Sequence, residues 1–137
     1  MPGRLQKVAA APEVVLDVAH NPQGARQLAA WLLANPRPTV AVFAALADKD
    51  IEGVVAPLVP HIRAWHLGPI TDAGPRGLAV EALEARVRAG GAAQVQAHAT
   101  LDAALQAARA AATGLGAYAR VLVFGSFHTV AAVGHRL

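Results

Sequence analysis

Short apolar runs alternate with stretches of helical periodicity along the whole chain, and this alternation constrains the fold more than any other feature. Runs rich in apolar and β-branched residues predict strands at 14–19, 39–46, 64–67, 94–97 and 120–124. Helical spacing predicts helices from Pro22 onward, over 51–59, 78–89 and 100–112, and from Gly125-Ser126 to Arg136. We therefore predict an α/β fold, a three-layer Rossmann-like domain with a mostly parallel sheet of about six strands flanked by helices.

Side chains that cap helices stand where the predicted helices begin. The predicted N-caps are Asn21, directly before Pro22 at the first helical position, then Asp50, and then either Thr100 or Asp102. Gly90-Gly91 predicts the end of one helix, and the helix before the last strand is expected to end ahead of Thr113-Gly114.

Length and composition indicate one soluble domain. The chain has 137 residues, which suits a single core, and 55% of them are hydrophobic, with a mean hydropathy of +0.37. No apolar run approaches the roughly 20 residues that a membrane helix needs, and the start of the chain lacks the apolar region of a secretory signal. We expect a cytoplasmic monomer with no membrane partner.

The absence of cysteine excludes a disulfide framework, a thiolate metal site and a cysteine nucleophile. The formal net charge is +3, but the arginines are scattered and few aromatic residues lie among them. Binding to nucleic acid is therefore not expected. The isolated histidines, His61, His66, His98 and His135, lack metal-binding spacing and are interpreted as surface or packing residues. Trp31 and Trp65 are expected to bury against the sheet.

The candidate site lies where strands give way to loops, because ligands of open α/β sheets bind outside the carboxyl ends of the strands. Four such places stand out in the sequence: 17–22, 48–50, 74–77 and 125–129. The first combines Asp17, His20 and Asn21 immediately before a helix. The N–H groups and dipole of that helix favour a phosphate or a carboxylate. On spacing alone, it is equally consistent that Asn21 only caps the helix and His20 only packs.

The motif Asp17-x-Ala19-His20-Asn21-Pro22 resembles the hallmark of the C-terminal domain of the Mur ligase and folylpolyglutamate synthase superfamily. Four further segments resemble that family in order and at suitable distances: Pro2-Gly3-Arg4-Leu5-Gln6, Leu46-Ala47-Asp48-Lys49-Asp50, Gly74-Pro75-Arg76-Gly77 and Phe124-Gly125-Ser126-Phe127-His128-Thr129-Val130. The resemblance covers essentially all of the chain. Two positions depart from it, because the family commonly has Gly at the position of Ala44 and Tyr at the position of His128. No family role is assigned to His128.

The resemblance implies a role for several residues. Asp17, His20, Ser126 and Lys49 are expected to bind glutamate, and Arg4, Asp17, His20 and Asn21 are expected to bind the nucleotide. Without the resemblance, Lys49 would be read as part of a solvated loop. In the family, ATP and Mg²⁺ activate the carboxylate of a pteroate or folate, and the amine of L-glutamate attacks it to form an amide.

Part of that chemistry is missing from this sequence. It has no phosphate-cradling G-x-x-x-x-G-K-[ST] segment and no cluster of acidic and histidine residues for a metal. The resemblance places these parts, including most Mg²⁺ ligands, in a larger N-terminal P-loop domain. We expect residues 1–137 to be the glutamate-binding domain of a longer enzyme, with no catalytic residue of its own and no activity in isolation.

Two other functions are alternatives to this interpretation. The first is a stand-alone α/β module that binds a nucleotide or another anion and regulates a partner. The second is a small Rossmann-like oxidoreductase, but the first strand-to-helix turn lacks the Gly-x-Gly-x-x-Gly fingerprint. The oxidoreductase is set aside, and the regulatory module remains the alternative.

Overall fold

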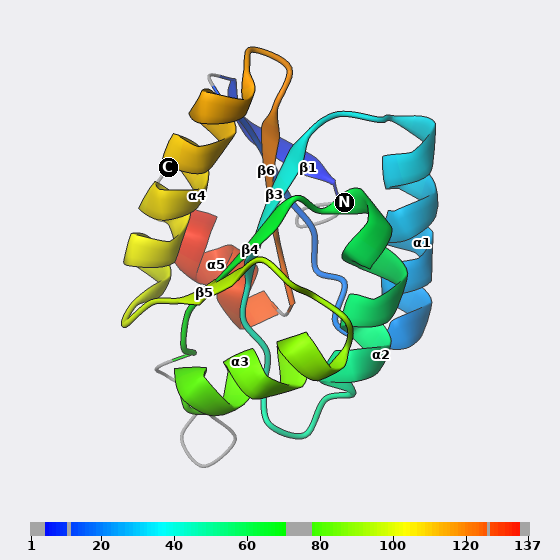
Figure 1. Cartoon of the computed structure of the whole chain (residues 1–137), viewed down its shortest axis with the longest axis vertical. Helices are drawn as coiled ribbons and strands as arrows, with labels where there is room; N and C mark the ends of the chain where they lie inside the picture. The colour runs from blue at the N-terminus through cyan, green and yellow to red at the C-terminus, as the bar shows by residue number, and fades with distance from the viewer. Residues whose placement is uncertain (1–4, 11, 71–77, 126, 135–137) are drawn as a thin grey trace.

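A computed structural model describes residues 5–10, 12–70, 78–125 and 127–134 of the chain (Figure 1). The elements, in chain order, are β1 (Gln6–Ala10), β2 (Glu13–Leu16), α1 (Pro22–Ala34), β3 (Thr39–Phe43), α2 (Ile51–Val55), the 3-10 helix η1 (Ala56–His61), β4 (Ala64–Leu67), α3 (Val80–Ala89), β5 (Val95–Ala97), α4 (Leu101–Leu115), β6 (Arg120–Phe124) and α5 (Phe127–Gly134). The predicted strands and helices follow one another in the predicted order over the described residues, and β1 precedes them as an additional strand.

The strands form one sheet in the order β1-β2-β6-β3-β4-β5, and every pair is parallel except β1 with β2. The prediction of a mostly parallel sheet is therefore confirmed. The antiparallel edge strand β1 was not predicted. Its short run begins with the polar Gln6 and Lys7, and its pairing with β2 contains a register shift between Lys7 and Ala9.

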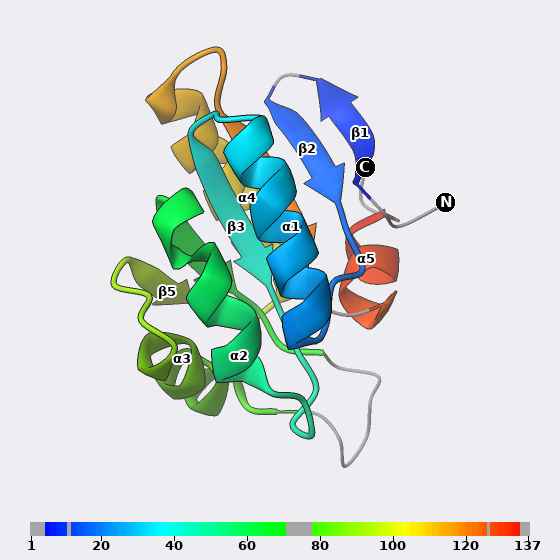
Figure 2. The same ribbon diagram turned by 90° about the vertical axis from the view of Figure 1, so that its right-hand side faces the viewer.

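Helices cover both faces of the sheet, which gives three layers (Figures 1 and 2). Alternate residues of each strand point to opposite faces. One set, including Ala41, Phe43 and Trp65, packs under α1, α2 and α3, and the other set, including Val40 and Val42, packs under α4 and α5. The sheet therefore separates two apolar cores.

The capping predictions are confirmed at three helices. Side-chain oxygens of Asn21, Asp50 and Thr100 accept hydrogen bonds from the N–H groups of Gly24, Gly53 and Ala103, at 2.8, 3.0 and 3.0 Å.

One predicted helix end is wrong, because α4 continues through Thr113 and Gly114 to Leu115. Gly114 is part of the helix. The Thr113 hydroxyl donates a hydrogen bond to the Arg109 carbonyl one turn earlier. The helix instead ends at Gly116, where φ is +119°.

None of the helices in the described ranges is long and apolar enough to cross a membrane.

Candidate functional site

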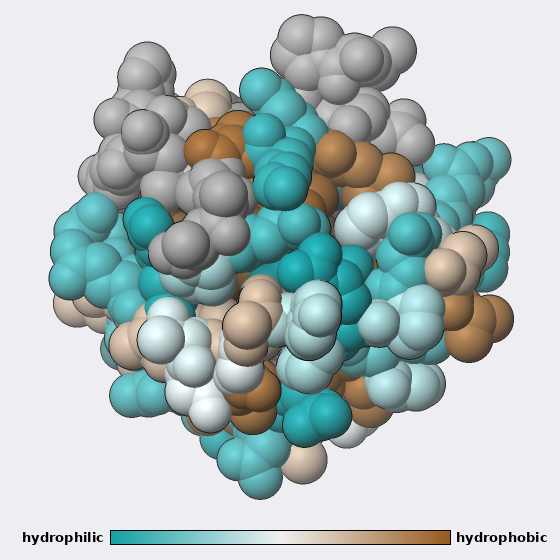
Figure 3. Space-filling view, turned by 90° about the horizontal axis from the view of Figure 1, so that it is seen from above, coloured by the Kyte–Doolittle hydropathy of each residue, from teal (hydrophilic) through white to brown (hydrophobic). Residues whose placement is uncertain are grey.

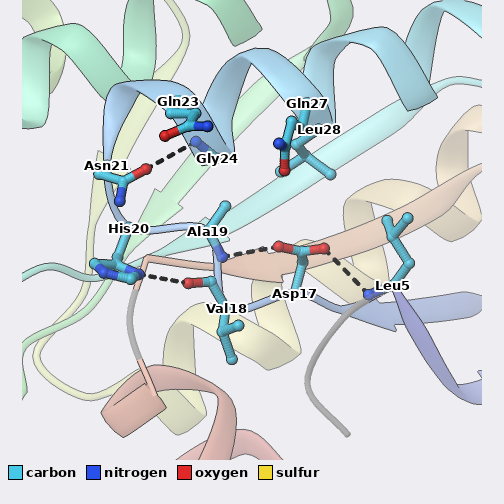
Figure 4. A pocket seen from close by; sticks show the side chains of 10 residues that line it. All are labelled: Leu5, Asp17, Val18, Ala19, His20, Asn21, Gln23, Gly24, Gln27 and Leu28. Carbon is cyan, nitrogen blue, oxygen red and sulfur yellow. Dashed lines mark hydrogen bonds between the residues drawn. The ribbon is translucent and has the colours of Figure 1, made fainter. Parts of the chain in front are cut away.

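The first motif lines a cavity at the carboxyl end of β2, beside the N-terminus of α1 (Figure 4). The cavity has a volume of about 250 Å³. Asp17, His20 and Asn21 all line it, together with Leu5, Gln23 and further residues of the loop and helix. The structure therefore brings together the three motif residues in its described part that were predicted to bind a nucleotide.

Asp17 holds the backbone around this cavity. The side chain is 4% exposed, and its two oxygens accept hydrogen bonds from Ala19 N–H at 2.8 Å and from Leu5 N–H at 3.1 Å. Its own N–H donates to the Val123 carbonyl at 2.9 Å. Asp17 thus joins the entry of β1 to the ends of β2 and β6.

His20 is oriented by a different neighbour. Its Nδ1 lies 2.9 Å from the Val18 carbonyl oxygen. Because a carbonyl can only accept, Nδ1 carries the hydrogen in this contact. The other nitrogen, Nε2, is then an acceptor when the ring is neutral and a donor when the ring is protonated. His20 can therefore receive either a cationic amine or an anionic group.

The start of α1 is built for an anion. Asn21 caps Gly24 N–H through its side chain and accepts from Ala25 N–H through its carbonyl, at 2.8 and 2.9 Å. Pro22 has no N–H group. The first-turn backbone donor outside these bonds is the N–H of Gln23, a residue that lines the cavity at the positive end of the helix.

Three strand ends meet tightly at this edge of the sheet. Gly125 donates its N–H to the Ala19 carbonyl at 3.0 Å, and the buried Thr129 hydroxyl donates to the Ala44 carbonyl at 3.0 Å. Ala44 is fully buried, and its methyl group belongs to the core under α4 and α5. The alanine at this position therefore packs in the core.

Lys49 lies in the loop after β3 and is not among the residues that line the cavity. Helix α2, which follows this loop, sits close to the start of α1, because a Cβ on Gly53 of α2 would lie 2.9 Å from Pro22 Cγ. Arg86 of α3 secures the loop by donating to the Ala47 and Lys49 carbonyls at 3.0 and 2.8 Å.

The sequence does not predict this role of Arg86. Its guanidinium also contacts the Glu52 carboxylate at 3.2 Å. An arginine on a helical surface gives no local signal that it bonds the carbonyls of a loop about forty positions earlier.

A histidine pair, buried His66 and half-buried His98, lies near the ends of β4 and β5. His66 Nδ1 and His98 Nε2 are 2.9 Å apart, and His66 is 7% exposed. Burial lowers the pKa of both rings, and the proximity of His98 lowers the pKa of His66 further. The two residues were predicted as surface or packing residues, and their pairing was not predicted.

Within the described ranges, no group of three or more histidine, cysteine, aspartate or glutamate side chains is arranged to hold a metal ion. Arg4, Ser126 and the segment 74–77 lie outside the described residues, so their predicted roles stay predictions.

The family model of the Mur ligase glutamate ligase domain matches residues 3–127 of the chain. The chain belongs to this family. The matched range includes the residues of the cavity, the loop after β3, and Gly125, whose N–H bonds the Ala19 carbonyl. The resemblance drawn from the motifs is therefore confirmed.

Individual relatives of this glutamate ligase domain are larger proteins. The dihydrofolate synthase/folylpolyglutamate synthase of Escherichia coli is 41% identical over 135 residues, which are 97% of this chain and 30% of the relative. The Mycobacterium tuberculosis folylpolyglutamate synthase solved with ADP is similar with a TM-score of 0.87 and 30% identity, over 99% of this chain and 32% of that one.

A second solved structure contains an amino acid. A bifunctional folylpolyglutamate synthase/dihydrofolate synthase, solved with Mn, AMPPNP and L-glutamate bound, has a TM-score of 0.83 and 34% identity, over 99% of this chain and 31% of that one. The glutamate ligase domain described here thus spans about a third of the length of these relatives.

Proposed function

We propose that this chain is the glutamate-binding domain of an ATP-dependent ligase that joins L-glutamate to dihydropteroate, to folate or to both. The observation that carries the proposal is the cavity in which Asp17, His20 and Asn21 meet at the start of α1. Family membership supports it, as do the relatives named dihydrofolate synthase/folylpolyglutamate synthase.

The residues of the cavity fit one phosphate or carboxylate group. Gln23 N–H and the positive end of α1 favour an anion, and Asn21 keeps the first turn in place. ATP, when bound, supplies the phosphoryl group that activates a carboxylate for attack by an amine. The part of this chain is to bind and orient the reactants and to exclude water from them.

His20 is the motif residue best placed to touch a ligand. Its ring is fixed by the Val18 carbonyl, which leaves Nε2 for the cavity. We propose that neutral His20 accepts a hydrogen bond from the ammonium group of glutamate and that protonated His20 donates to a phosphate oxygen. Asp17 serves mainly as a positioning residue, because its oxygens hold two backbone N–H groups.

Three other residues keep their proposed roles. Ser126 and Lys49 would hold carboxylates of glutamate, and Arg4 would reach the nucleotide. For Lys49, support comes from its place two residues before α2, a helix that packs against the start of α1 at Gly53 and Pro22.

The described residues include no group of three or more histidine, cysteine, aspartate or glutamate side chains that could hold a metal, so we assign metal binding to none of them. We propose Mg²⁺ as the metal of the complete enzyme, with ligands in the additional N-terminal P-loop domain. We also propose that the complete enzyme is a cytoplasmic monomer and that residues 1–137 alone do not turn over ATP.

The test uses the complete enzyme that contains this domain, assayed for glutamate-dependent ADP release with dihydropteroate and, separately, with a reduced folate. His20→Ala should lower kcat/KM for glutamate or ATP by about tenfold to a hundredfold, the value of one charge-assisted contact. Arg26→Ala is the matched control, because Arg26 is exposed on α1 and does not line the cavity. The thermal midpoint of each variant is measured beside the kinetics.

Two results would overturn the proposal. If His20→Ala loses activity only in proportion to lost folded protein, His20 is a packing residue. If no carboxylate acceptor gives glutamate-dependent ADP release, while the chain still binds nucleotide, the regulatory module is the better interpretation.

A further inference from the structure

A second cavity lies at the opposite end of the parallel strands, with a volume of about 380 Å³. Its walls come from the C-terminal end of α1, from the segments before β3 and β4, and from the start of β6. Figure 3 looks onto this end of the molecule, where strongly hydrophilic residues gather near the centre of the view. Arg37, His61, Arg63 and Arg120 line the cavity. The wall is therefore basic.

Arg120 is the most unusual of these residues, because its long cationic side chain is only 1% exposed. Nε donates to the Thr39 hydroxyl at 3.0 Å, and one terminal nitrogen, Nη2, donates to the Asn35 carbonyl at 2.6 Å. The guanidinium lies over the Trp31 ring, 4.6 Å from its centroid. The side chain is thus held in one orientation by three neighbours, all of which are uncharged.

The charge of Arg120 has no carboxylate within ion-pair distance in the described part of the chain. The nearby Glu13 instead contacts Arg37 at 2.9 Å and Lys7 at 3.5 Å. Burial and the neighbouring Arg37 lower the pKa of Arg120, whereas Glu13 raises it. A buried cation without an anionic partner is unfavourable, and a bound anion would relieve that cost.

One edge of the guanidinium remains available for such an anion. Nη1 of Arg120 makes no hydrogen bond to the described residues, and no fully buried side-chain nitrogen or oxygen among them lacks a partner. Nη1 is therefore in contact with solvent, and that solvent lies in the cavity that Arg120 lines. Arg63, on the same wall, is exposed and forms no ion pair with a described residue.

We propose that this cavity binds a small phosphate-bearing anion between Arg63 and Arg120. The number of unpaired positive charges in the cavity wall favours a phosphate over a single carboxylate. Glu13 neutralises Arg37, whereas Arg63 and Arg120 leave two positive charges that a phosphate dianion matches. Donors from different segments also surround a tetrahedral group better than a planar one.

This site is separate from the glutamate and nucleotide cavity. The two cavities lie at opposite ends of α1, whose 13 residues span roughly 20 Å. Failure of one proposal therefore leaves the other standing.

The experiment titrates the 137-residue chain with inorganic phosphate and with tripolyphosphate at constant ionic strength, and citrate serves as the carboxylate arm. The arginine Nε–Hε signals in ¹H–¹⁵N NMR spectra report on each guanidinium. The Arg63 and Arg120 signals should shift together and saturate with phosphate. Arg63→Gln should weaken phosphate binding about tenfold, and Arg26→Gln, an exposed arginine away from both cavities, less than about twofold.

Arg120→Gln removes a buried group and can unfold the chain, so Arg120→Lys is the second variant. This variant keeps the positive charge but loses the planar guanidinium with its fixed set of N–H donors, so it should also weaken phosphate binding about tenfold. Its Arg63 signal should keep the chemical shift of the folded chain. If Arg63→Gln and Arg26→Gln weaken phosphate binding equally, the anion is attracted by the overall positive charge of the chain, and the proposed site is wrong. So would unshifted arginine signals, or tighter binding of citrate than of either phosphate compound.

Discussion

Replacing Gly125 by alanine is the most informative single perturbation of this fold. Gly125 follows β6, has φ of +123°, and bonds the Ala19 carbonyl through its N–H. A Cβ at this position would overlap the Ala44 carbonyl oxygen and lie 3.0 Å from its carbon and 3.1 Å from Phe43 Cδ1. No flexible side chain can move aside at the closest contact, because Ala44 contributes backbone there.

Two costs add up in the Gly125→Ala variant. A non-glycine residue at such a φ costs about 1–3 kcal/mol. Insertion of a methyl group into close-packed backbone costs about another 1–3 kcal/mol. We therefore expect the free energy of unfolding to fall by about 4 kcal/mol, a large share of the roughly 5–15 kcal/mol that stabilises a domain.

Urea unfolding, followed by far-UV circular dichroism, measures this loss. Gly114→Ala is the matched control, because Gly114 lies inside α4 and a Cβ there would meet no atom within 4 Å. The control should gain about 0.5 kcal/mol through helix propensity. A loss below about 1 kcal/mol for Gly125→Ala would refute the reasoning, since the three strand ends would then separate at little cost.

Further predictions concern titration and hydrogen bonding. Because the folded chain lowers the pKa of His66 and His98 below 6.5, the unfolded chain binds more protons, so their contribution is fully present above pH 6.5 and is lost as the pH falls below it. Urea midpoints at several pH values should show this loss, and His66→Gln should reduce it; an unchanged slope would contradict the assignment. Asp50→Ala should lower the free energy of unfolding by about 1 kcal/mol through the lost cap of α2, as measured by urea unfolding beside Asp48→Ala, whose residue does not cap that helix. Asp17→Asn should cost about 1–3 kcal/mol in the same assay, because an amide NH₂ faces a backbone N–H that the carboxylate accepted; no loss would show that the loop rearranges.

The sequence was sufficient for the fold wherever local patterns act alone. Buried strands such as Thr39–Phe43 and Arg120–Phe124 appear as apolar runs, and the caps at Asn21, Asp50 and Thr100 bond three positions ahead. Both signals lie within a few residues of the feature they determine. They are therefore visible without tertiary information.

Features that depend on distant partners were not visible in this way. Arg86 bonds carbonyls 37 and 39 positions away, and His66 meets His98 across 32 positions. Arg120 begins an apolar strand, yet its side chain is buried against Trp31 of α1 and Asn35, the residue that follows this helix. The same sequence patterns also suit surface residues, so only the packed structure distinguishes them.

The first motif shows how a recognisable pattern can arise mostly from the needs of a loop. Asp17 accepts two backbone N–H groups, and Asn21 caps α1. Pro22 occupies the first helical position, where a missing N–H costs nothing. Ala19 is buried, and its carbonyl accepts a hydrogen bond from Gly125 N–H at 3.0 Å.

His20 differs from the other motif positions in what its side chain does. One ring nitrogen, Nδ1, is hydrogen-bonded to the Val18 carbonyl, and His20 lines the cavity. Substitutions at the supporting positions should therefore change stability and activity together, because they move the loop. A substitution at His20 should change activity with little change in stability. The motif thus separates into residues that build the site and one that acts in it, and the comparison of thermal midpoints with kcat/KM across the motif would reveal that division.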